Sequence, residues 1–420
     1  MLRLPASLQG LTRDGWLLFA TRFTRLFAYG SLSVVLVLYL IGVGLTEPQS
    51  GLVLTLTLVG DTVVSLYLTT RADRFGRRRM LMVGAGLMAA AGVAFASTSN
   101  LWLLVLAGIV GVISPSGQEV GPFLPIEQAA LSHVVTDRTR TEVFAWYTMT
   151  GALATALGAL AAGTLTQALQ SSGWQAVPSY RTVVVLYAAL GLVLAILFSR
   201  LSRAAEAASA TGARSARPTF AAFSGLEQSR DVVLKLASLF ALDAFGGGFV
   251  VQSLAAYWFH LRFGVDAGTL GAIFFWANIL AGISALAASR LASRFGLIKT
   301  MVVTHLPSNL LLILVPLMPT LQLAIAVLLV RFSISQMDVP TRQSYLMAVV
   351  PPEERSAAAG IAGVARTTGA AISPLFVGLM FAQPALMNAP FFIAGTLKIA
   401  YDLLLYRAFV AVKPPEEMQR

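Results

Sequence analysis

Long apolar stretches alternate with short polar loops along the whole of this chain. A helix needs about 20 mostly apolar residues to cross the hydrocarbon core of a bilayer, and twelve stretches meet this requirement. They are residues 16–44, 50–70, 80–98, 101–131, 142–168, 181–200, 232–260, 268–289, 300–318, 321–347, 357–382 and 389–411. The pattern therefore predicts an all-α membrane protein with twelve spanning helices.

Basic residues are concentrated in every second loop. The loops after the even-numbered stretches carry the clusters Arg71 to Arg79; Arg138 and Arg140; Arg200 to Arg230; Arg290, Arg294 and Lys299; and Arg355. The remaining loops hold only Arg181 and Arg262 between them. Because short loops rich in Lys and Arg stay on the cytoplasmic side, we predict that both termini are cytoplasmic.

Composition supports a membrane protein and excludes several other classes. Hydrophobic residues make up 57% of the chain and charged residues 12%, about half the share found in soluble domains. The net charge of +11 is spread one loop at a time, which fits loops facing anionic lipid and argues against nucleic-acid binding. The absence of cysteine excludes disulfides, iron–sulfur clusters and thiolate zinc sites.

No cofactor is expected from the motifs of the chain. It carries no Walker loop, no nucleotide fingerprint and no nucleophile elbow, so we expect neither ATP-driven transport nor enzymatic catalysis. The three histidines, His133, His260 and His305, are too scattered to predict a metal site.

The two halves of the chain repeat each other. Arg74-Phe75-Gly76 recurs 220 residues later as Arg294-Phe295-Gly296, and Glu119-Val120 has its counterpart in Asp338-Val339. Between the halves lies a stretch rich in Ala, Ser, Gly and Arg. We interpret this order as one duplicated unit, with an N-terminal bundle at residues 1–200, a cytoplasmic linker at 201–230 and a C-terminal bundle at 231–420.

The loop after the second stretch carries a specific arrangement of charge. It reads Asp73-Arg74-Phe75-Gly76-Arg77-Arg78-Arg79, and Gly76 would permit a tight turn with a positive φ. This loop resembles the one between helices 2 and 3 of the major facilitator superfamily. Two positions depart from the family pattern, since Thr69 stands where its first glycine is usual and Arg71 where an apolar residue is common.

The resemblance implies two six-helix bundles related by a pseudo-two-fold axis normal to the membrane, and more narrowly the drug and metabolite efflux branch. It also implies a cytoplasmic gating loop made of Asp73, Arg74, Gly76, Arg77, Asp137 and Arg140. In this arrangement Asp73 caps the helix that begins near residues 357–361, and Arg77 meets Asp137. We expect Asp73→Asn to lower transport while leaving membrane insertion intact.

Ionisable residues inside the predicted spans are functional candidates, because burying them in a membrane is costly. The candidates for a proton or substrate pathway are Arg25, Asp61, Glu119, Glu127, Asp243, Asp338, Arg342 and Arg366. Most lie roughly 12–18 Å from the cytoplasmic ends of their helices. They form either a proton-titrating and ion-binding site or a set of ion pairs between the two bundles that closes the cytoplasmic side.

Local patterns add expectations within the spans. Asp338 and Arg342, and likewise Lys398 and Asp402, are spaced i,i+4 and can pair on one helix face. Residues 114–125 contain three prolines and two glycines, which should kink or unwind the fourth span. We interpret the glycines of the fifth span at positions 151, 158 and 163 as packing sites.

We predict a secondary-active transporter that works by alternating access and effluxes small organic or amphipathic compounds in exchange for protons. The alternative within transporters is uptake of an organic anion or metabolite, with Arg25, Arg342 and Arg366 as candidate binders. A lipid translocase or a non-transporting membrane receptor is an alternative of another class. The scarcity of lysine relative to arginine, 4 against 26, suggests a bacterial source and hence a plasma membrane, where we expect a monomer.

Overall fold

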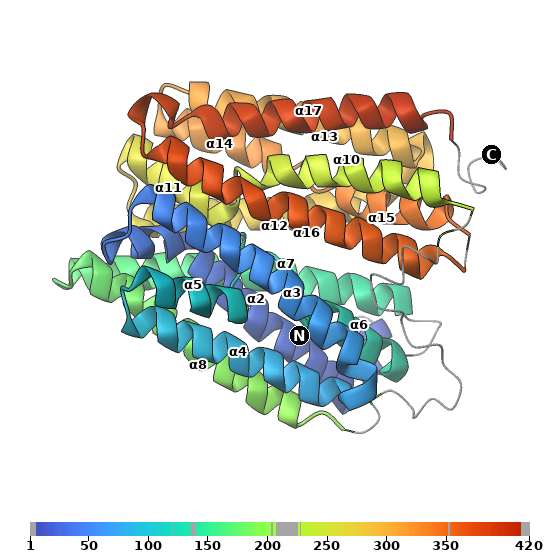
Figure 1. The fold of residues 1–420 in the computed structure, drawn as a ribbon, viewed down its shortest axis with the longest axis horizontal. Coiled ribbons are helices and arrows are strands. Elements are labelled where there is room, and N and C mark those ends of the chain that lie inside the picture. The colour runs from blue at the N-terminus through green and yellow to red at the C-terminus, as the bar shows by residue number, and fades with distance from the viewer. Residues whose placement is uncertain are drawn as a thin grey trace. The chain divides into compact units, whose positions relative to one another are not determined.

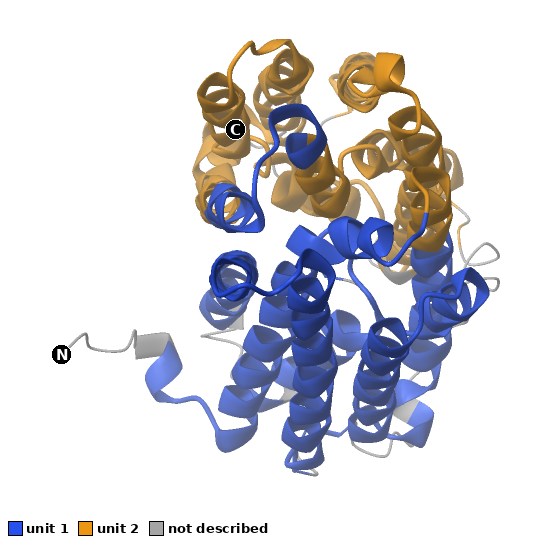
Figure 2. Ribbon diagram, turned by 90° about the vertical axis from the view of Figure 1, so that its left-hand side faces the viewer, with its two compact units in different colours: residues 1–45, 56–215, 259–275 blue, residues 46–55, 216–258, 276–420 orange. Residues whose placement is uncertain are grey.

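The computed structural model describes residues 6–119, 121–135, 140–202, 205–206, 226, 228–351 and 353–412, without the side chains of residues 6–7, 73, 133, 140–141, 289 and 356. Across these residues the secondary structure is helical and contains no β-strand. The chain divides into two compact units, which Figure 2 shows in different colours. The all-α prediction is confirmed.

Unit 1 comprises residues Met1–Leu45, Leu56–Ser215 and Phe259–Phe275. Its helices are α1 (Ala6–Gln9), α2 (Arg13–Gly42), most of α3 (Glu47–Phe75), α4 (Arg77–Ser97), α5 (Leu101–Val110), α6 (Phe123–Val134), α7 (Arg140–Ser171) and α8 (Ala176–Ser199). The long helix α2 packs along α7 and α8, and α4 packs along α8 (Figure 1).

Small residues allow α2 and α7 to approach closely. A Cβ on Gly158 would overlap the backbone carbonyl of Phe27, and one on Gly30 would overlap the backbone of Thr155. The Ser31 hydroxyl donates a hydrogen bond to the carbonyl of Gly158 at 3.0 Å. Gly158 therefore serves packing, as predicted for the fifth span.

Unit 2 comprises residues Thr46–Thr55, Ala216–Trp258 and Trp276–Arg420. Its helices are α10 (Arg230–Gly248), most of α11 (Gln252–Phe263) and α12 (Ala267–Phe295), α13 (Leu297–Leu314), η3 (Val315–Leu317), α14 (Leu321–Phe332), α15 (Asp338–Ala348), α16 (Arg355–Phe381), η4 (Pro384–Leu386) and α17 (Ala389–Phe409). Helix α10 packs against α16 and α17, and α13 packs against α17 and α15. Their shared core contains Phe240, Tyr345 and Tyr401.

The helices long enough to cross a membrane largely coincide with the spans predicted from the sequence. Within the described residues, ten helical segments are long and apolar enough to cross a membrane, and each matches one predicted span. The other two predicted spans, 101–131 and 321–347, are each built from a shorter apolar helix, a break and a second helix: α5 with α6, and α14 with α15. The prediction that prolines and glycines unwind the fourth span is confirmed.

Two further breaks were not predicted. The segment expected as one helix at 232–260 is interrupted between α10 and α11, directly after three consecutive glycines at 246–248. The segment 321–347 is interrupted between Phe332 and Asp338. The division of the chain at residues 201–230 stays a prediction, because most of that stretch lies outside the described residues.

Candidate functional site

The break between α5 and α6 places Glu119 on a non-helical segment inside unit 1. Gly117 and Gly121 adopt positive φ angles of 69° and 79°, which a side chain would strain. The segment is held in place by hydrogen bonds to its backbone: Thr155 of α7 donates to the carbonyl of Gly117 at 3.3 Å, and Tyr187 of α8 donates to the carbonyl of Val112. Glu119 therefore lies on a loop that hydrogen bonds from α7 and α8 hold in place.

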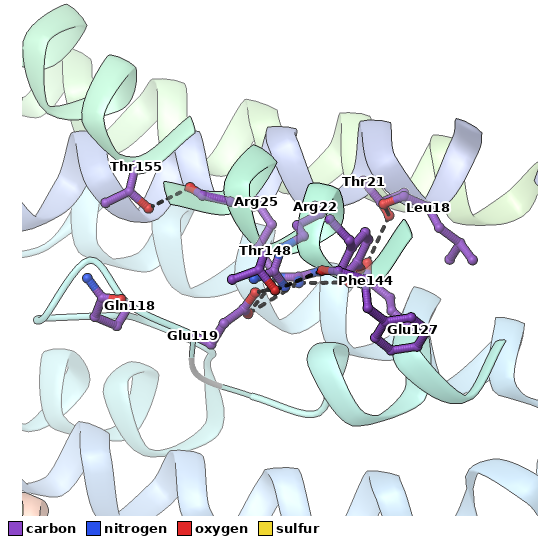
Figure 3. Close-up of polar contacts among 12 residues, drawn as sticks. Leu18, Thr21, Arg22, Arg25, Gln118, Glu119, Glu127, Phe144, Thr148 and Thr155 are labelled. Carbon is purple, nitrogen blue, oxygen red and sulfur yellow. Dashed lines mark hydrogen bonds and ion pairs between the residues drawn. The ribbon is translucent and has the colours of Figure 1, made fainter. Parts of the chain in front are cut away.

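Two arginines of α2 bind two glutamates of this region (Figure 3). We call the set Arg22, Arg25, Glu119 and Glu127 the Arg25 cluster. The Arg25 guanidinium binds Glu127 through two hydrogen bonds, Nη1 to Oε1 at 2.7 Å and Nη2 to Oε2 at 2.8 Å. Its Nη2 also lies 3.1 Å from Glu119 Oε1, and Arg22 Nη1 lies 2.5 Å from the same oxygen.

Neutral donors complete the environment of Glu127. The Thr21 hydroxyl donates to Glu127 Oε1 at 2.8 Å, and the Tyr147 hydroxyl donates to Oε2. Arg25 and Glu127 are both 0% exposed, whereas the Glu119 side chain is 19% exposed. Burial of ion pairs is tolerated when the charges are paired and the remaining polar atoms are satisfied. The charges of this cluster are paired, and Glu127 has further donors, but the buried Nε of Arg22 has no hydrogen-bond partner among the described residues.

Asp61 of α3 has a different environment. Its side chain is buried, and its Oδ1 atom has no hydrogen-bond partner among the described residues. The group that contacts its carboxylate is the backbone N–H of Gly121, on the same loop as Glu119. No cation is recorded beside it in the described part of the chain, in contrast to Glu119 and Glu127.

A second buried cluster lies in unit 2 around Asp243 of α10, and we call it the Asp243 cluster. Arg342 Nη1 of α15 lies 2.8 Å from Asp243 Oδ2, and Lys398 Nζ of α17 lies 2.6 Å from Oδ1. His305 Nε2 of α13 is 3.7 Å from the same Oδ1. Arg342 Nη2 also lies 3.4 Å from Asp338, so the predicted i,i+4 pair is present.

The predicted pair between Lys398 and Asp402 is wrong. Lys398 binds Asp243, and Asp402 instead contacts His305 Nδ1 at 2.8 Å and accepts a hydrogen bond from Asn309 Nδ2 at 2.9 Å. The spacing brings both side chains to one face of α17, but each contacts a different helix. Lys398 binds α10, and Asp402 contacts α13. His305 and Asn309 were not predicted as parts of a polar cluster.

Two arginines near the Asp243 cluster are less fully paired. Arg331 at the end of α14 and Arg366 of α16 are half-buried, and the Nε atom of each is buried without a hydrogen-bond partner among the described residues. The Nε atom of Arg342 is likewise buried without a hydrogen-bond partner among the described residues.

Six of the ionisable residues predicted for a proton or substrate pathway thus form two local clusters. Arg25, Glu119 and Glu127 meet in unit 1, and Asp243, Asp338 and Arg342 meet in unit 2. These pairs are internal to a unit, whereas the ion-pair interpretation placed them between the two bundles. No group of three or more His, Asp or Glu side chains in the described part of the chain is arranged to hold a metal ion.

The predicted gating loop is described in part. Gly76 has a φ of 100°, which confirms the tight turn. The backbone N–H groups of Arg77 and Arg78 donate to the Glu206 carboxylate at 2.7 and 3.2 Å, a partner that the sequence did not indicate. Arg74 is exposed and lies against Phe75. The side chains of Asp73 and Arg140, and the whole of Asp137, lie outside the described residues.

Comparison with known proteins agrees with this architecture. Residues 18–374 match the model of the Major Facilitator Superfamily. The chain is 30% identical over 436 residues to an uncharacterized membrane protein of Saccharomyces cerevisiae, YJR124C, covering 97% of each protein. The yeast relative does not support the bacterial source that we expected.

Solved transporters share the fold at low sequence identity. The nucleoside transporter NupG superposes with a TM-score of 0.71 at 13% identity over 95% of this chain and 99% of its own. A D-xylose-proton symporter gives 0.72 at 15% identity, over 94% and 97%. The human organic anion transporter MFSD10 gives 0.64 at 15% identity, over 96% and 100%.

The family match covers most of the chain and agrees with its multi-pass helical structure. The chain is an integral membrane transporter and not an enzyme. It belongs to the major facilitator superfamily.

Proposed function

We propose that this transporter couples the movement of a small organic compound to a proton gradient by alternating access, in the efflux direction. The observation that carries the proton coupling is the environment of Asp61. An ionised carboxylate is very costly to bury without a cation, so such a group is suited to bind and release a proton. Glu127 is buried and Glu119 is partly buried, and arginines bind both. Of the other buried acids of unit 1, Asp14 accepts hydrogen bonds from Ser202, whereas Asp61 has no cation recorded beside it among the described residues.

The position of Asp61 provides a route from proton binding to a structural change. It contacts the backbone of Gly121, which has a positive φ and lies two residues from Glu119 on the break between α5 and α6. Loss of charge at Asp61 would weaken its hydrogen bond to this segment. Irregular segments in transporter helices commonly lie at binding sites, which supports a role for this one in the transport cycle.

The proposal can be tested with purified protein in liposomes under an imposed pH gradient. A panel of radiolabelled compounds, comprising a nucleoside, a pentose and an aromatic carboxylate, is first screened for accumulation and for exchange. Asp61→Asn should abolish accumulation driven by the gradient but retain exchange of the compound at equal pH, since exchange needs no net proton movement. Asp231→Asn, at an exposed acid, serves as the matched control.

Unchanged pH-driven accumulation by Asp61→Asn would refute the assignment of the proton to this residue. In that case Glu119→Gln and Asp338→Asn become the variants to examine, because these two acids occupy matching positions in the two halves. Loss of both accumulation and exchange in Asp61→Asn, with correct folding, would place Asp61 in substrate binding instead.

Uptake of an organic anion is the second candidate function. It is favoured by Arg331 and Arg366, whose Nε atoms have no partner in the described part of unit 2. A lipid translocase or a receptor remains an alternative of another class, and either would bind a ligand without concentrating a small solute in liposomes. The imposed gradients also decide direction, since efflux and uptake respond to opposite orientations.

We further propose that the protein acts as a monomer in the plasma membrane, with both termini in the cytoplasm. Two bundles, at residues 1–200 and 231–420, would rock about the linker at 201–230. The gating loop around Gly76 would close the cytoplasmic side, with Asp73 and Arg77 as its main contacts. Labelling of single cysteines at positions 76 and 296 tests this topology, because both should react only from the cytoplasmic side.

A further inference from the structure

His305 of α13 is a buried titratable residue that the proposed transport mechanism does not use. Its side chain is 5% exposed, and its two ring nitrogens face carboxylates on two different helices. Nδ1 lies 2.8 Å from Asp402 Oδ1 of α17, and Nε2 lies 3.7 Å from Asp243 Oδ1 of α10. A histidine placed in this way can carry a proton on both nitrogens, because each N–H would point to an anion.

The Nδ1 side of the ring is fixed by its neighbours. Asn309 Nδ2 lies 3.1 Å from Nδ1, but it donates to Asp402 Oδ2 at 2.9 Å, so α13 contacts both oxygens of this carboxylate. The Tyr401 ring packs edge-on against the imidazole, with 5.9 Å between the ring centroids. Since a carboxylate at Nδ1 favours a proton on that nitrogen, Nε2 is the position at which a proton can bind and leave.

The Nε2 side of the ring shares its carboxylate oxygen with a lysine. Lys398 Nζ of α17 lies 2.6 Å from Asp243 Oδ1, which is the oxygen that Nε2 approaches. Arg342 of α15 binds the other oxygen of Asp243 at 2.8 Å. A proton that arrives at Nε2 would therefore place a second cation beside Oδ1, in competition with Lys398.

Polar atoms without protein partners lie on residues that neighbour the imidazole. Among the described residues, Asn309 Oδ1 and the hydroxyls of Ser308 and Tyr401 are buried and have no hydrogen-bond partner. Ser308 and Asn309 follow His305 by three and four residues on α13, and Tyr401 contacts its ring. Buried polar groups that no protein group reaches are usually satisfied by water, and water can carry protons to the ring.

The other charges around this part of α13 do not contact the imidazole. Among the described residues, the ion pairs of His305 within 4 Å are those with Asp243 and Asp402. Lys299, the other ionisable residue of α13, is exposed. The remaining buried or half-buried ionisable residues on the helices packed against α13 are Arg331, Asp338, Arg342, Tyr345, Lys398 and Tyr401.

We infer that His305 is a proton-binding site of unit 2, which alternates between a neutral imidazole bonded to Asp402 and an imidazolium that contacts both Asp402 and Asp243. Protonation adds positive charge beside Asp243 Oδ1 and so weakens the contact by which Lys398 joins α17 to α10. The site is separate from Asp61 of unit 1, and it rests on the proposed proton coupling only for its use in transport.

Histidine NMR tests this inference without a substrate or a gradient. The chain has only three histidines, so the full-length protein labelled with 15N and 13C at histidine gives few ring signals, and His305→Gln identifies those of His305. We expect Nδ1 to stay protonated while Nε2 gains its proton in one step between about pH 5 and 8, where imidazoles change charge. A His305 ring that stays doubly protonated, or stays neutral, over this range would overturn the inference.

Variants at the neighbouring charges should change this step in opposite directions. Asp402→Asn should lower the proton affinity of His305 about 10- to 100-fold, the loss expected for a charge-assisted hydrogen bond. Lys398→Gln should raise the proton affinity, because a competing cation is lost from Asp243 Oδ1. Asp231→Asn, at an exposed acid on α10, is the control that should leave it unchanged. An unchanged step in both Asp402→Asn and Lys398→Gln would refute the bridging arrangement, and either variant decides if the other does not fold.

Exchange in liposomes at equal pH on both sides tests the use of this proton in transport. His305→Gln should flatten the pH dependence of exchange of the radiolabelled nucleoside, pentose or aromatic carboxylate. His260→Gln should not, since the ring of His260 lies 2.9 Å from the backbone carbonyl of Val265 and is the matched control. A His305→Gln profile identical to that of the wild type would refute a role in transport. Since no gradient is applied, a failure of the Asp61 assignment would leave this result unaffected.

Discussion

Neutralising Glu127 should destabilise unit 1 strongly, and a second substitution should partly restore its stability. In Glu127→Gln, Arg22 and Arg25 would share the single charge of Glu119, which leaves one buried cation without compensation. Removing one partner of a buried ion pair typically costs about 3–5 kcal/mol. This agrees with the roughly 4 kcal/mol between unit charges 4 Å apart at an effective dielectric constant near 20.

The double variant Arg25→Gln/Glu127→Gln should lose less stability than Glu127→Gln alone. It leaves one cation, Arg22, paired with one anion, Glu119, at 2.5 Å. The two introduced amides can still hydrogen-bond to each other, to Thr21 and to Tyr147. As a graded comparison, Glu119→Gln should cost less than Glu127→Gln, about 1.5–3 kcal/mol, because Arg22 loses its carboxylate partner but Glu119 is partly exposed and Arg25 keeps both bonds to Glu127.

The free energy of unfolding can be measured by titrating the wild type, Arg25→Gln, Glu127→Gln and the double variant with SDS in mixed micelles. These four proteins form a double-mutant cycle that gives the coupling between Arg25 and Glu127. We expect a coupling of several kcal/mol. If the double variant loses as much stability as the sum of the two single variants, the pair is not coupled and the electrostatic account of this cluster is wrong.

Other features of the fold lead to further predictions. Glu206→Gln should cost about 1 kcal/mol at the start of α4 and speed hydrogen exchange at the amides of Arg77 and Arg78, whereas Glu353→Gln, at an exposed acid, should not. Gly158→Ala should destabilise the protein by about 1–3 kcal/mol because its Cβ would overlap the Phe27 carbonyl, whereas Gly86→Ala, with no atom within 4 Å, should be neutral or stabilising in a thermal unfolding assay. Equal effects in either matched pair would contradict the packing or capping argument concerned.

Much of the architecture could be predicted because it depends on local sequence. The length of each apolar run determines a span, the prolines and glycines between Ser114 and Pro125 determine a break, and Gly76 supplies the turn that other residues would strain. The break after Gly248 follows three consecutive glycines, which disfavour a continuous helix. The break before Asp338 has no comparable signal, and we have no physical account of it.

The partners of the buried charges could not be predicted, because pairing depends on which helices pack together. The i,i+4 spacing of Lys398 and Asp402 describes one face of α17 only. In the fold that face packs against α10 and α13. Lys398 therefore binds Asp243, which is 155 residues distant in the sequence, and Asp402 contacts His305, which is 97 residues distant. Glu206 likewise follows from the fold, since it approaches α4 from 129 residues further along the chain.

The sequence repeat carries an asymmetry that becomes meaningful only with these contacts. Glu119 and Asp338 match in the two halves, and each lies at a break in its span. Glu119 is paired with two arginines, whereas Asp338 lies 3.4 Å from one arginine, Arg342, which also binds Asp243. If full pairing marks a structural role, substitutions in the Arg25 cluster should mainly change stability, and Asp338→Asn should mainly change transport. A stable Glu127→Gln variant with altered ligand preference would reverse this assignment.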